Sequence, residues 1–455
     1  MQQAEARSNV AAGMIRLTQW ASTAALRELP PAVRRRAAVV LADDLAAMVA
    51  ASTEPQVAAA RAGLVAGSGP AQATVFAVGA PRLDRASAAS ANGIAITWCE
   101  LDEGYRLVPC HAGAYVLPAL LSEAETRGLT ADQLLSALAV AYEITARIAM
   151  TFPFASIRVH PHAAFATVGA AAAAALVRRQ NAATLLGSVS GAASMAFAGP
   201  FRHAMEGALV RNAWTSAGAW IGLHCAEWAE AGITGLPETA YDAFVLGLGT
   251  ELRAGELTDR LGEGWAILDG YQKVYACCQY GHAAVEAALA LHARAGSGRG
   301  LPEEIVVETH ARGLALDTVE PATTLAAKFS LPHAMAAIAT TGTGGQPAFT
   351  DATLHDPTIA DLRRRVRLTP YENVGAPPFD RPSRVTWRFA DGTRWSEQVL
   401  SAQGGSDRPF EETTLRAKFA DLTAPFPRMA GVLSALLDGE RGGEAWPSLV
   451  DEMVR

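Results

Sequence analysis

The stretch AAFATVGAAAAAALV, residues 163–177, decides the fold class of this chain. It is apolar on nearly every side, so we expect a helix that is buried all around. Alanine favours this conformation because its side chain loses no rotamer freedom in a helix. At 15 residues the run is shorter than the roughly 20 residues that cross a bilayer. The stretch therefore predicts the central helix of a soluble, mainly helical protein.

Further helices are predicted on both sides of this run. Residues 31–51 begin with Pro31, continue with an arginine-rich turn and carry a long apolar stripe. Residues 130–150 begin with Thr130 and Gln133, the pair of a capping box, in which each side chain satisfies a free backbone N–H. Residues 213–231 have the composition of another helix. Roughly the first 250 residues thus read as one helix after another.

The middle of the chain has a different residue pattern, which indicates strands. Residues 303–310 form a short segment with β-branched residues at its centre. Residues 383–389 and 394–400 are two alternating runs on either side of Asp391 and Gly392. An Asp-Gly pair between alternating runs is typical of a β-hairpin. The segment predicts a smaller α+β domain.

The chain becomes helical again at its C-terminal end, where residues 411–419 and 429–437 are predicted helices. The simplest architecture is mainly α with an α+β part. We expect a large all-helical domain built from both chain ends, residues 1–265 and 403–455. A smaller α+β lid domain, residues 266–402, is inserted between them.

Composition excludes several classes of function. The 455 residues are enough for two or three domains, and the net charge of −7 makes nucleic acid an unexpected partner. Five cysteines without a C-x-x-C pair favour a reducing cytoplasm, and the first ten residues contain no apolar signal core. We expect no membrane partner. The chain has no P-loop, no G-x-G-x-x-G after a strand and no G-x-S-x-G, so kinase, nucleotide-cofactor and α/β-hydrolase functions lack their usual support.

The first candidate site is an acidic segment with nearby bases: Glu100, Asp102, Glu103, Arg106 and His111. Three carboxylates within four residues repel one another, which tends to raise at least one pKa. Apolar residues alternate with the acids, so part of the segment should be buried and its carboxylates need partners. The alternative interpretation is a solvated acidic turn.

The second candidate is His160-Pro161-His162, in a loop before the alanine-rich helix. A histidine near a helix N-terminus can hold or protonate an anion, because the free N–H groups there favour negative charge. A zinc site is an alternative, but no H-E-x-x-H or Cys/His spacing supports it. A capping or core histidine is the other alternative.

The third candidate is the run KVYACCQYGH, residues 273–282. We expect Lys273 to bind a carboxylate and His282 to act in catalysis or to support the site, although a solvated lysine and a core histidine fit equally well. The adjacent cysteines are expected to be buried small apolar residues, since neighbouring cysteines rarely bridge. Arg211, just before a helix, is either a surface residue or a bidentate carboxylate clamp.

The order and spacing of these motifs resemble the 2-methylcitrate dehydratase family (MmgE/PrpD), which also includes cis-aconitate decarboxylase and an iminodisuccinate epimerase. The resemblance extends from about Ala21 to Leu437. The motifs that carry it are, in chain order, Ala91-Asn92-Gly93, Asp102-Glu103, His111, Leu117-Pro118-Ala119-Leu120, Tyr142-Glu143, His160-Pro161 nine residues before Gly169, Gly232-Ile233-Thr234-Gly235, Lys273, Cys277-Cys278, His282, Ala327-Lys328-Phe329-Ser330 with His333, and Lys418-Phe419.

The resemblance implies a large helical domain with an α+β lid, an active site in the cleft between them, a homodimer, and neither metal nor organic cofactor. The residues that match the family's functional positions are Asp102, Glu103, His111, His160, Lys273 and His282. Those that depart are Thr97 for a histidine, Glu100 for an aspartate, Gly104 for a threonine and Arg211 for a lysine.

The expected function is a cofactor-independent cytoplasmic lyase acting on a small polycarboxylate, as a dehydratase or decarboxylase of a 2-methylcitrate-like or cis-aconitate-like acid. His111 and His160 are the expected acid/base pair and Asp102 orients one of them. Lys273 and Arg211 hold carboxylates. The remaining expected substrate contacts are Glu100, Arg106 and His282. The alternatives are an epimerase or isomerase of a dicarboxylate such as iminodisuccinate, and a non-catalytic carboxylate-binding relative.

Overall fold

The computed structural model describes residues 2–156 and 158–455. Helices dominate, and the strands form small sheets, so the prediction of a mainly α fold with an α+β part is confirmed.

The helices of the first part of the chain are α1 (Gln2–Ala24), α2 (Pro31–Ala50), α3 (Pro55–Gly67), α4 (Arg85–Ile96), α5 (Ala112–Arg127), α6 (Ala131–Thr151), α7 (Pro161–Val177), α8 (Ala182–Ser194), α9 (Arg202–Glu206), α10 (Ala213–Glu230) and α11 (Thr239–Tyr241). Those of the later part are α12 (His282–Ala295), α13 (Ala311–Leu314), α14 (Thr324–Lys328), α15 (Leu331–Thr341), α16 (Asp351–His355), α17 (Pro357–Arg363), α18 (Glu412–Leu422), α19 (Met429–Leu437) and α20 (Trp446–Met453). The strands are β1 (Ala73–Thr74), β2 (Arg82–Leu83), β3 (Gly104–Tyr105), β4 (Gly270–Tyr271), β5 (Glu304–Thr309), β6 (Val366–Pro370), β7 (Ser383–Arg388) and β8 (Arg394–Val399).

Helix α7 lies at the centre of the helical part, and every one of its residues is buried. Helices α5, α6, α8 and α10 pack around it. Small residues make this possible: Gly218 and Gly222 of α10 face Ala166 and Ala170 of α7 so closely that a Cβ on either glycine would collide. The sequence prediction of a buried central helix is therefore confirmed, and glycine and alanine make its close contact with α10.

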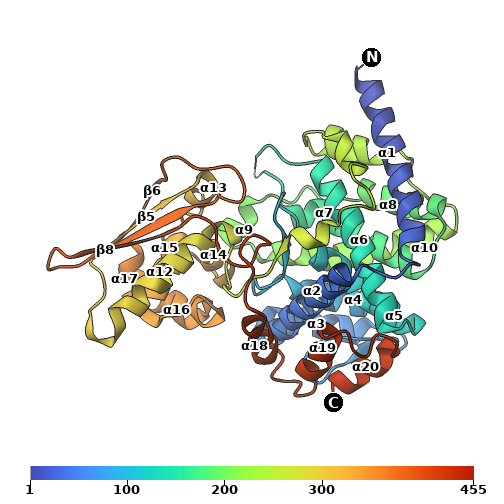
Figure 1. The fold of residues 1–455 in the computed structure, drawn as a ribbon. Helices are drawn as coiled ribbons and strands as arrows, with labels where there is room; N and C mark the ends of the chain where they lie inside the picture. The colour runs from blue at the N-terminus through green and yellow to red at the C-terminus, as the bar shows by residue number, and fades with distance from the viewer. Residues whose placement is uncertain (1, 157) are drawn as a thin grey trace.

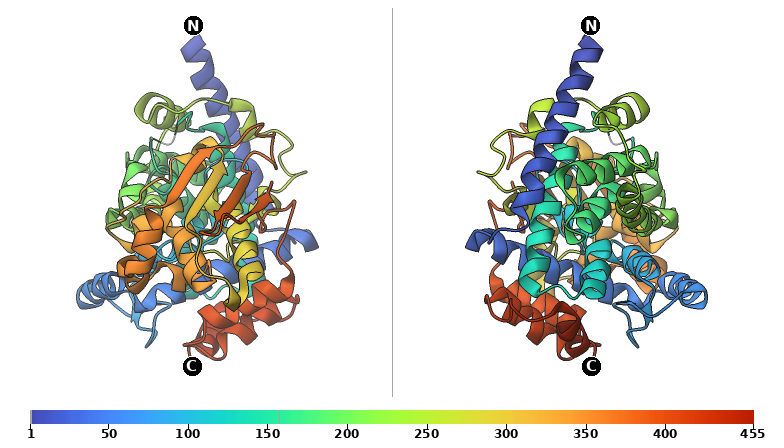
Figure 2. Two further views of the ribbon diagram at one scale, coloured as in Figure 1. Left: turned by 90° about the vertical axis from the view of Figure 1, so that its left-hand side faces the viewer. Right: turned by 90° about the vertical axis from the view of Figure 1, so that its right-hand side faces the viewer.

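A four-stranded sheet with the order β6-β5-β7-β8 forms the core of the other part. Strands β7 and β8 pair antiparallel across the turn that contains Gly392, whose φ of 82° favours glycine. The predicted hairpin is confirmed. Helix α12 packs against β7 and β8, and α15 packs against α12. Figure 1 shows this sheet with its helices at the left of the molecule, and the strands face the viewer in the left view of Figure 2.

The C-terminal helices return to the helical part, as Figure 1 shows below α2. Helices α18 and α19 contact α2, and α20 contacts α5. This is the packing expected if both chain ends build one helical domain, while the domain limits at residues 265 and 402 stay predictions.

Helix α6 is long and apolar enough to cross a membrane by length and composition, the single such helix among the described residues. Of its most apolar window, 89% is buried inside the protein, as in the core helix of a soluble protein. Its predicted capping box is present, with the Thr130 side chain accepting from the Gln133 backbone N–H. The cytoplasmic location stays a prediction.

Candidate active site

The acidic loop, residues 97–103, connects α4 to the segment before α5 and is held from several directions. The chain contains three lysines, and all of them contact this loop. Lys328 of α14 donates to the Trp98 carbonyl at 3.0 Å, and Lys418 of α18 donates to the Leu101 carbonyl at 2.8 Å. The third, Lys273, reaches the acidic side chains. Segments far apart in the sequence therefore fix the backbone of the acidic loop, which carries Glu100, Asp102 and Glu103.

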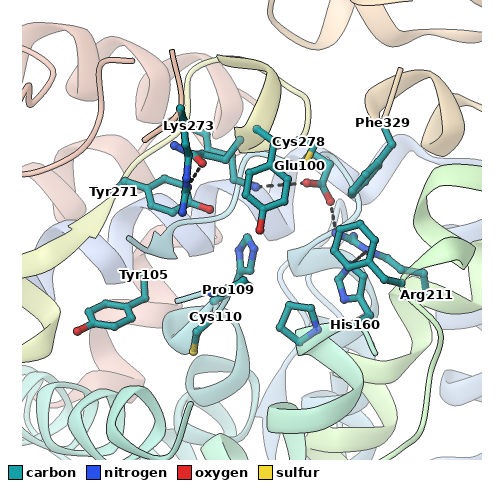
Figure 3. Close-up of a pocket in the computed structure, with 16 residues that line it drawn as sticks. Glu100, Tyr105, Pro109, Cys110, His160, Arg211, Tyr271, Lys273, Cys278 and Phe329 are labelled. Carbon is teal, nitrogen blue, oxygen red and sulfur yellow. Dashed lines mark hydrogen bonds and ion pairs between the residues drawn. The ribbon is translucent and has the colours of Figure 1, made fainter. Parts of the chain in front are cut away.

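Lys273 lies between two buried carboxylates. Its Nζ is 3.4 Å from Oε2 of Glu100 and 3.3 Å from Oδ1 of Asp102, and Glu100 also pairs with Arg211. Figure 3 draws Glu100 with dashed lines to both cations. Burial alone would raise the pKa of Glu100, but the charges of Arg211 and Lys273 outweigh it and hold that pKa below its usual value. The group is a charged network buried inside the protein.

Asp102 joins this network to His111. Burial opposes ionisation of Asp102, but Lys273 and His111 hold its pKa well below the usual range. The Nδ1 atom of His111 is 2.7 Å from Oδ2 of Asp102 and 2.8 Å from the carbonyl oxygen of Glu103, and the N–H direction fits the carbonyl. Two acceptors at Nδ1 assign the ring proton to that nitrogen, which leaves the lone pair on Nε2. His111 lines the pocket, so this arrangement suits a base.

His160 is the residue directly before α7, where its Nδ1 accepts the backbone N–H of His162 at 3.2 Å. Its Nε2 lies 3.4 Å from Nε of Arg211. A neutral imidazole accepts at one nitrogen only, so only one of these two contacts is a hydrogen bond in a given tautomer. Burial and the charge of Arg211 lower the pKa of His160, which keeps the ring neutral. His160 thus combines a capping contact with a position in the pocket.

The pocket holds about 470 Å³ of empty space including its mouth. Five of the eight predicted site residues line it: Glu100, His111, His160, Arg211 and Lys273. Asp102 lies behind them in contact with His111 and Lys273. The structure brings together in space the three clusters that the sequence presents separately, while the catalytic roles of these residues stay predictions.

The other two predicted residues lie outside the pocket lining. Arg106 donates to Asp380 at 2.5 Å and to the Pro378 carbonyl at 3.1 Å, so it ties the loop before β7 to the helical part. His282 is buried at the start of α12 with Nε2 3.1 Å from the Cys277 carbonyl. Burial lowers its pKa to about 3. Both residues support the walls of the site.

Tyr271 and Arg381 are among the lining residues that the sequence does not predict. The Tyr271 ring packs on Gly104, where β3 pairs with β4, and any Cβ at Gly104 would collide with it. This contact explains why glycine stands at that position. Arg381 lies between Pro378 and Pro382 in the loop before β7, and its guanidinium donates to Gln279 and to the Arg106 carbonyl. Neither residue belongs to a motif; the sole sequence signal is the position of Tyr271 two residues before Lys273.

Glu103 is an acid of the segment with a raised pKa, and burial, rather than the repulsion among acids that the sequence suggests, is the main cause. Its Oε1 accepts from the Gly113 N–H at 2.7 Å and its Oε2 accepts from the Tyr142 hydroxyl at 3.0 Å. Burial raises its pKa to about 8. The side chain therefore anchors the first turn of α5, next to His111. No group of three or more His, Cys, Asp or Glu side chains in residues 2–156 and 158–455 is arranged to hold a metal ion.

Comparison with known families agrees with this arrangement. The MmgE/PrpD N-terminal domain profile matches residues 15–247, and the MmgE/PrpD C-terminal domain profile matches residues 275–430. No curated protein matches the chain. The N-terminal match alone spans more than half of the chain and ends beyond Arg211, and the C-terminal match begins just after Lys273. The chain therefore belongs to the MmgE/PrpD family, whose members are generally enzymes and include dehydratases and decarboxylases.

Proposed function

We propose that the protein is a cofactor-independent lyase that acts on a small carboxylic acid, with the acids of the 2-methylcitrate and cis-aconitate type as first candidates. The observation that carries the proposal is the lone pair on Nε2 of His111, in a pocket that cations also line. Nδ1 of His111 is held by Asp102 and the Glu103 carbonyl, which leaves Nε2 to accept a proton. We further propose a cytoplasmic homodimer.

In a dehydration, His111 removes the C–H proton next to a substrate carboxylate. The bond to the β-hydroxyl then breaks while the neutral His160 ring hydrogen-bonds that hydroxyl, and the hydroxyl leaves as water with the proton that His111 removed. The intermediate carries negative charge on the carboxylate, and Lys273 and Arg211 stabilise that charge within the buried site. No oxidant or reductant enters the balance.

Decarboxylation uses the same groups in a different order. The C–C bond to the carboxylate breaks, carbon dioxide leaves, and the electron pair that stays on carbon takes a proton from the histidine pair. Epimerisation is a second candidate because His111 and His160 both line the pocket, and inversion at a carbon needs one group to remove a proton and another to return it.

Proton NMR in D2O tests the proposal. The protein is incubated with 2-methylcitrate, citrate, cis-aconitate, an iminodisuccinate mixture and the monocarboxylic acid 3-hydroxybutyrate. A new olefinic product or loss of a carboxylate supports the lyase, whereas deuterium uptake without elimination supports the epimerase. If all five compounds stay unchanged, these substrates are excluded and a non-catalytic carboxylate binder gains support.

Two variants connect any activity to the site. We expect His111→Asn and His160→Ala to lower kcat by about 10²–10⁴-fold, the usual contribution of a general acid or base. His355→Ala is the control, because the His355 side chain is 72% exposed and pairs with Asp351 at the surface. Near-normal turnover by the His160 variant would remove that histidine from the mechanism.

A further inference from the structure

Strand β4 places Tyr271 directly opposite Gly104 of β3. Side chains at such paired positions lie on the same face of the two strands. A Cβ built on Gly104 would overlap both Cζ and the hydroxyl oxygen of Tyr271. The phenol end of Tyr271 therefore fills the space that a side chain at position 104 would take, directly after the acidic loop.

The backbone on both sides of Tyr271 is fixed. The Gly270 carbonyl accepts from Nη2 of Arg36 at 2.5 Å, and the Gln272 N–H donates to the Gly404 carbonyl at 3.0 Å. Tyr271 is 6% exposed, and Figure 3 shows its ring in the wall of the pocket. A side chain held in this way loses little conformational freedom when a ligand binds.

The Tyr271 hydroxyl differs from those of the other two tyrosines that line the pocket. The Tyr105 hydroxyl donates to Sδ of Met150 at 3.1 Å, and the Tyr280 hydroxyl accepts from Arg312 at 3.1 Å. Within the described part of the chain, the Tyr271 hydroxyl has no hydrogen-bond partner. Burial raises the pKa of Tyr271, so the hydroxyl keeps its proton at neutral pH and can donate a hydrogen bond.

This donor lies beside the proposed base. The rings of Tyr271 and His111 are 6.4 Å apart between centroids, with an angle of 74° between their planes. When a substrate presents a C–H bond to Nε2 of His111, the carboxylate on that carbon is one bond further away. Lys273 and Arg211 supply positive charge to it, while their N–H groups also contact Glu100. A neutral hydroxyl without another partner adds a directed hydrogen bond to this charge.

We propose that Tyr271 is a further catalytic residue, whose hydroxyl donates a hydrogen bond to the substrate carboxylate next to the carbon that His111 deprotonates. The inference rests on the proposed function and adds a donor to its site. The phenol keeps its proton throughout. Its hydrogen bond strengthens as negative charge grows on that carboxylate, so the intermediate gains more than the bound substrate does.

Isothermal titration calorimetry with two probes tests this without turnover. Tricarballylate carries three carboxylates and represents the bound substrate. The nitronate of 3-nitropropionate carries its negative charge on the nitro group, in place of the carboxylate that takes up charge, and represents the intermediate. Tyr271→Phe removes the hydroxyl and keeps the ring. We expect it to weaken nitronate binding by about tenfold or more, the usual effect of one hydrogen bond to a charged group, and tricarballylate binding by less.

Moving the hydroxyl to the opposite strand separates hydrogen bonding from packing. Tyr271→Ala opens the space at position 104, so Gly104→Ser in that background returns a hydroxyl near the original place. We expect this double variant to bind the nitronate at least threefold more tightly than Tyr271→Ala with Gly104→Ala. Tyr105→Phe is the matched control, because it removes a hydroxyl that is bonded to Met150, and its affinities should equal those of the wild type.

The outcomes are distinct once circular dichroism has verified that each variant is folded. An equal loss for both probes in Tyr271→Phe, or equal nitronate binding by the two double variants, overturns the role of Tyr271 and leaves the proposed function intact. Binding of tricarballylate without any binding of the nitronate to the wild type also overturns it. If the wild type binds neither probe, the carboxylate site itself fails, and the proposed function fails with it.

Discussion

Replacing Lys273 by methionine removes the charge at the centre of the buried network and nearly keeps the side-chain volume. The ammonium lies 3.3 Å from Asp102 and 3.4 Å from Glu100. At an effective dielectric constant of about 20, each contact is worth roughly 5 kcal/mol before desolvation is subtracted. Removing one partner of a buried ion pair typically costs about 3–5 kcal/mol. Glu100 still pairs with Arg211 in the variant, so Asp102 is the buried carboxylate that loses its cation. We therefore expect a loss of stability at the lower end of this range, about 3 kcal/mol.

The pH dependence separates lost charge from lost packing. In the wild type, the folded-state pKa of Asp102 lies below its unfolded value, so its contribution to stability is present at neutral pH and is lost on acidification. Without Lys273, burial raises that pKa, and Asp102 takes up a proton in mild acid. The stability deficit of Lys273→Met should therefore shrink as pH falls from 7.5 toward 4.5.

Thermal unfolding measures this deficit. For 455 residues, an unfolding entropy of about 2.1 cal/mol/K per residue gives roughly 1 °C of Tm per kcal/mol, so the expected loss at pH 7.5 is about 3 °C. Lys273→Arg is the matched control, because it keeps the positive charge and any packing defect it causes should be independent of pH. A Tm loss below 1 °C at pH 7.5, or a deficit that grows in acid, would refute the charge argument.

Three further predictions follow from buried contacts. Amine-selective acetylation read by mass spectrometry should leave all three lysines unmodified in the folded protein, since each is committed to the acidic loop; rapid labelling of Lys273 would show that the site opens. Gly104→Ala should lower stability by about 1–3 kcal/mol through collision with Tyr271, with partial rescue by Tyr271→Ala; equal losses in the single and double variants would contradict that contact. Burial lowers the pKa of His282 to about 3, so below pH 6.5 the unfolded state binds a proton that the folded state does not. The stability of the wild type should therefore fall by up to about 1.4 kcal/mol per pH unit relative to His282→Gln, measured by paired thermal unfolding. A stability difference that does not change with pH would count against this reasoning.

Local sequence signals predict the regular elements well. The alanine run of α7, the capping box of α6 and the Asp-Gly hairpin between β7 and β8 all depend on neighbouring residues. The sequence does not predict strand β6, because this strand lies at the sheet edge with Val366 as its one buried residue. An edge strand of this kind lacks the apolar alternation that marks a strand covered on one face.

Candidate residues for the site are also present in the sequence, as acids, histidines and cations grouped in three clusters. His111 and Asp102 lie close along the chain, so their contact is nearly local. Their meeting with Lys273 and Arg211 is not, because these come from segments more than a hundred residues away. The family resemblance, rather than any spacing rule, indicates from the sequence that the three clusters belong to one site.

The sequence by itself determined the helical character, the hairpin, the family and the residue types available for chemistry, since these depend on local propensity and motif order. The tertiary structure alone decided which charges are compensated. It directs Glu100 onto Arg211 and Lys273, turns Arg106 toward the loop at Asp380, and brings Arg381 into the pocket. The physical reason is that burial and counter-ions are properties of the packed protein, and in a buried site they decide what each charge can bind.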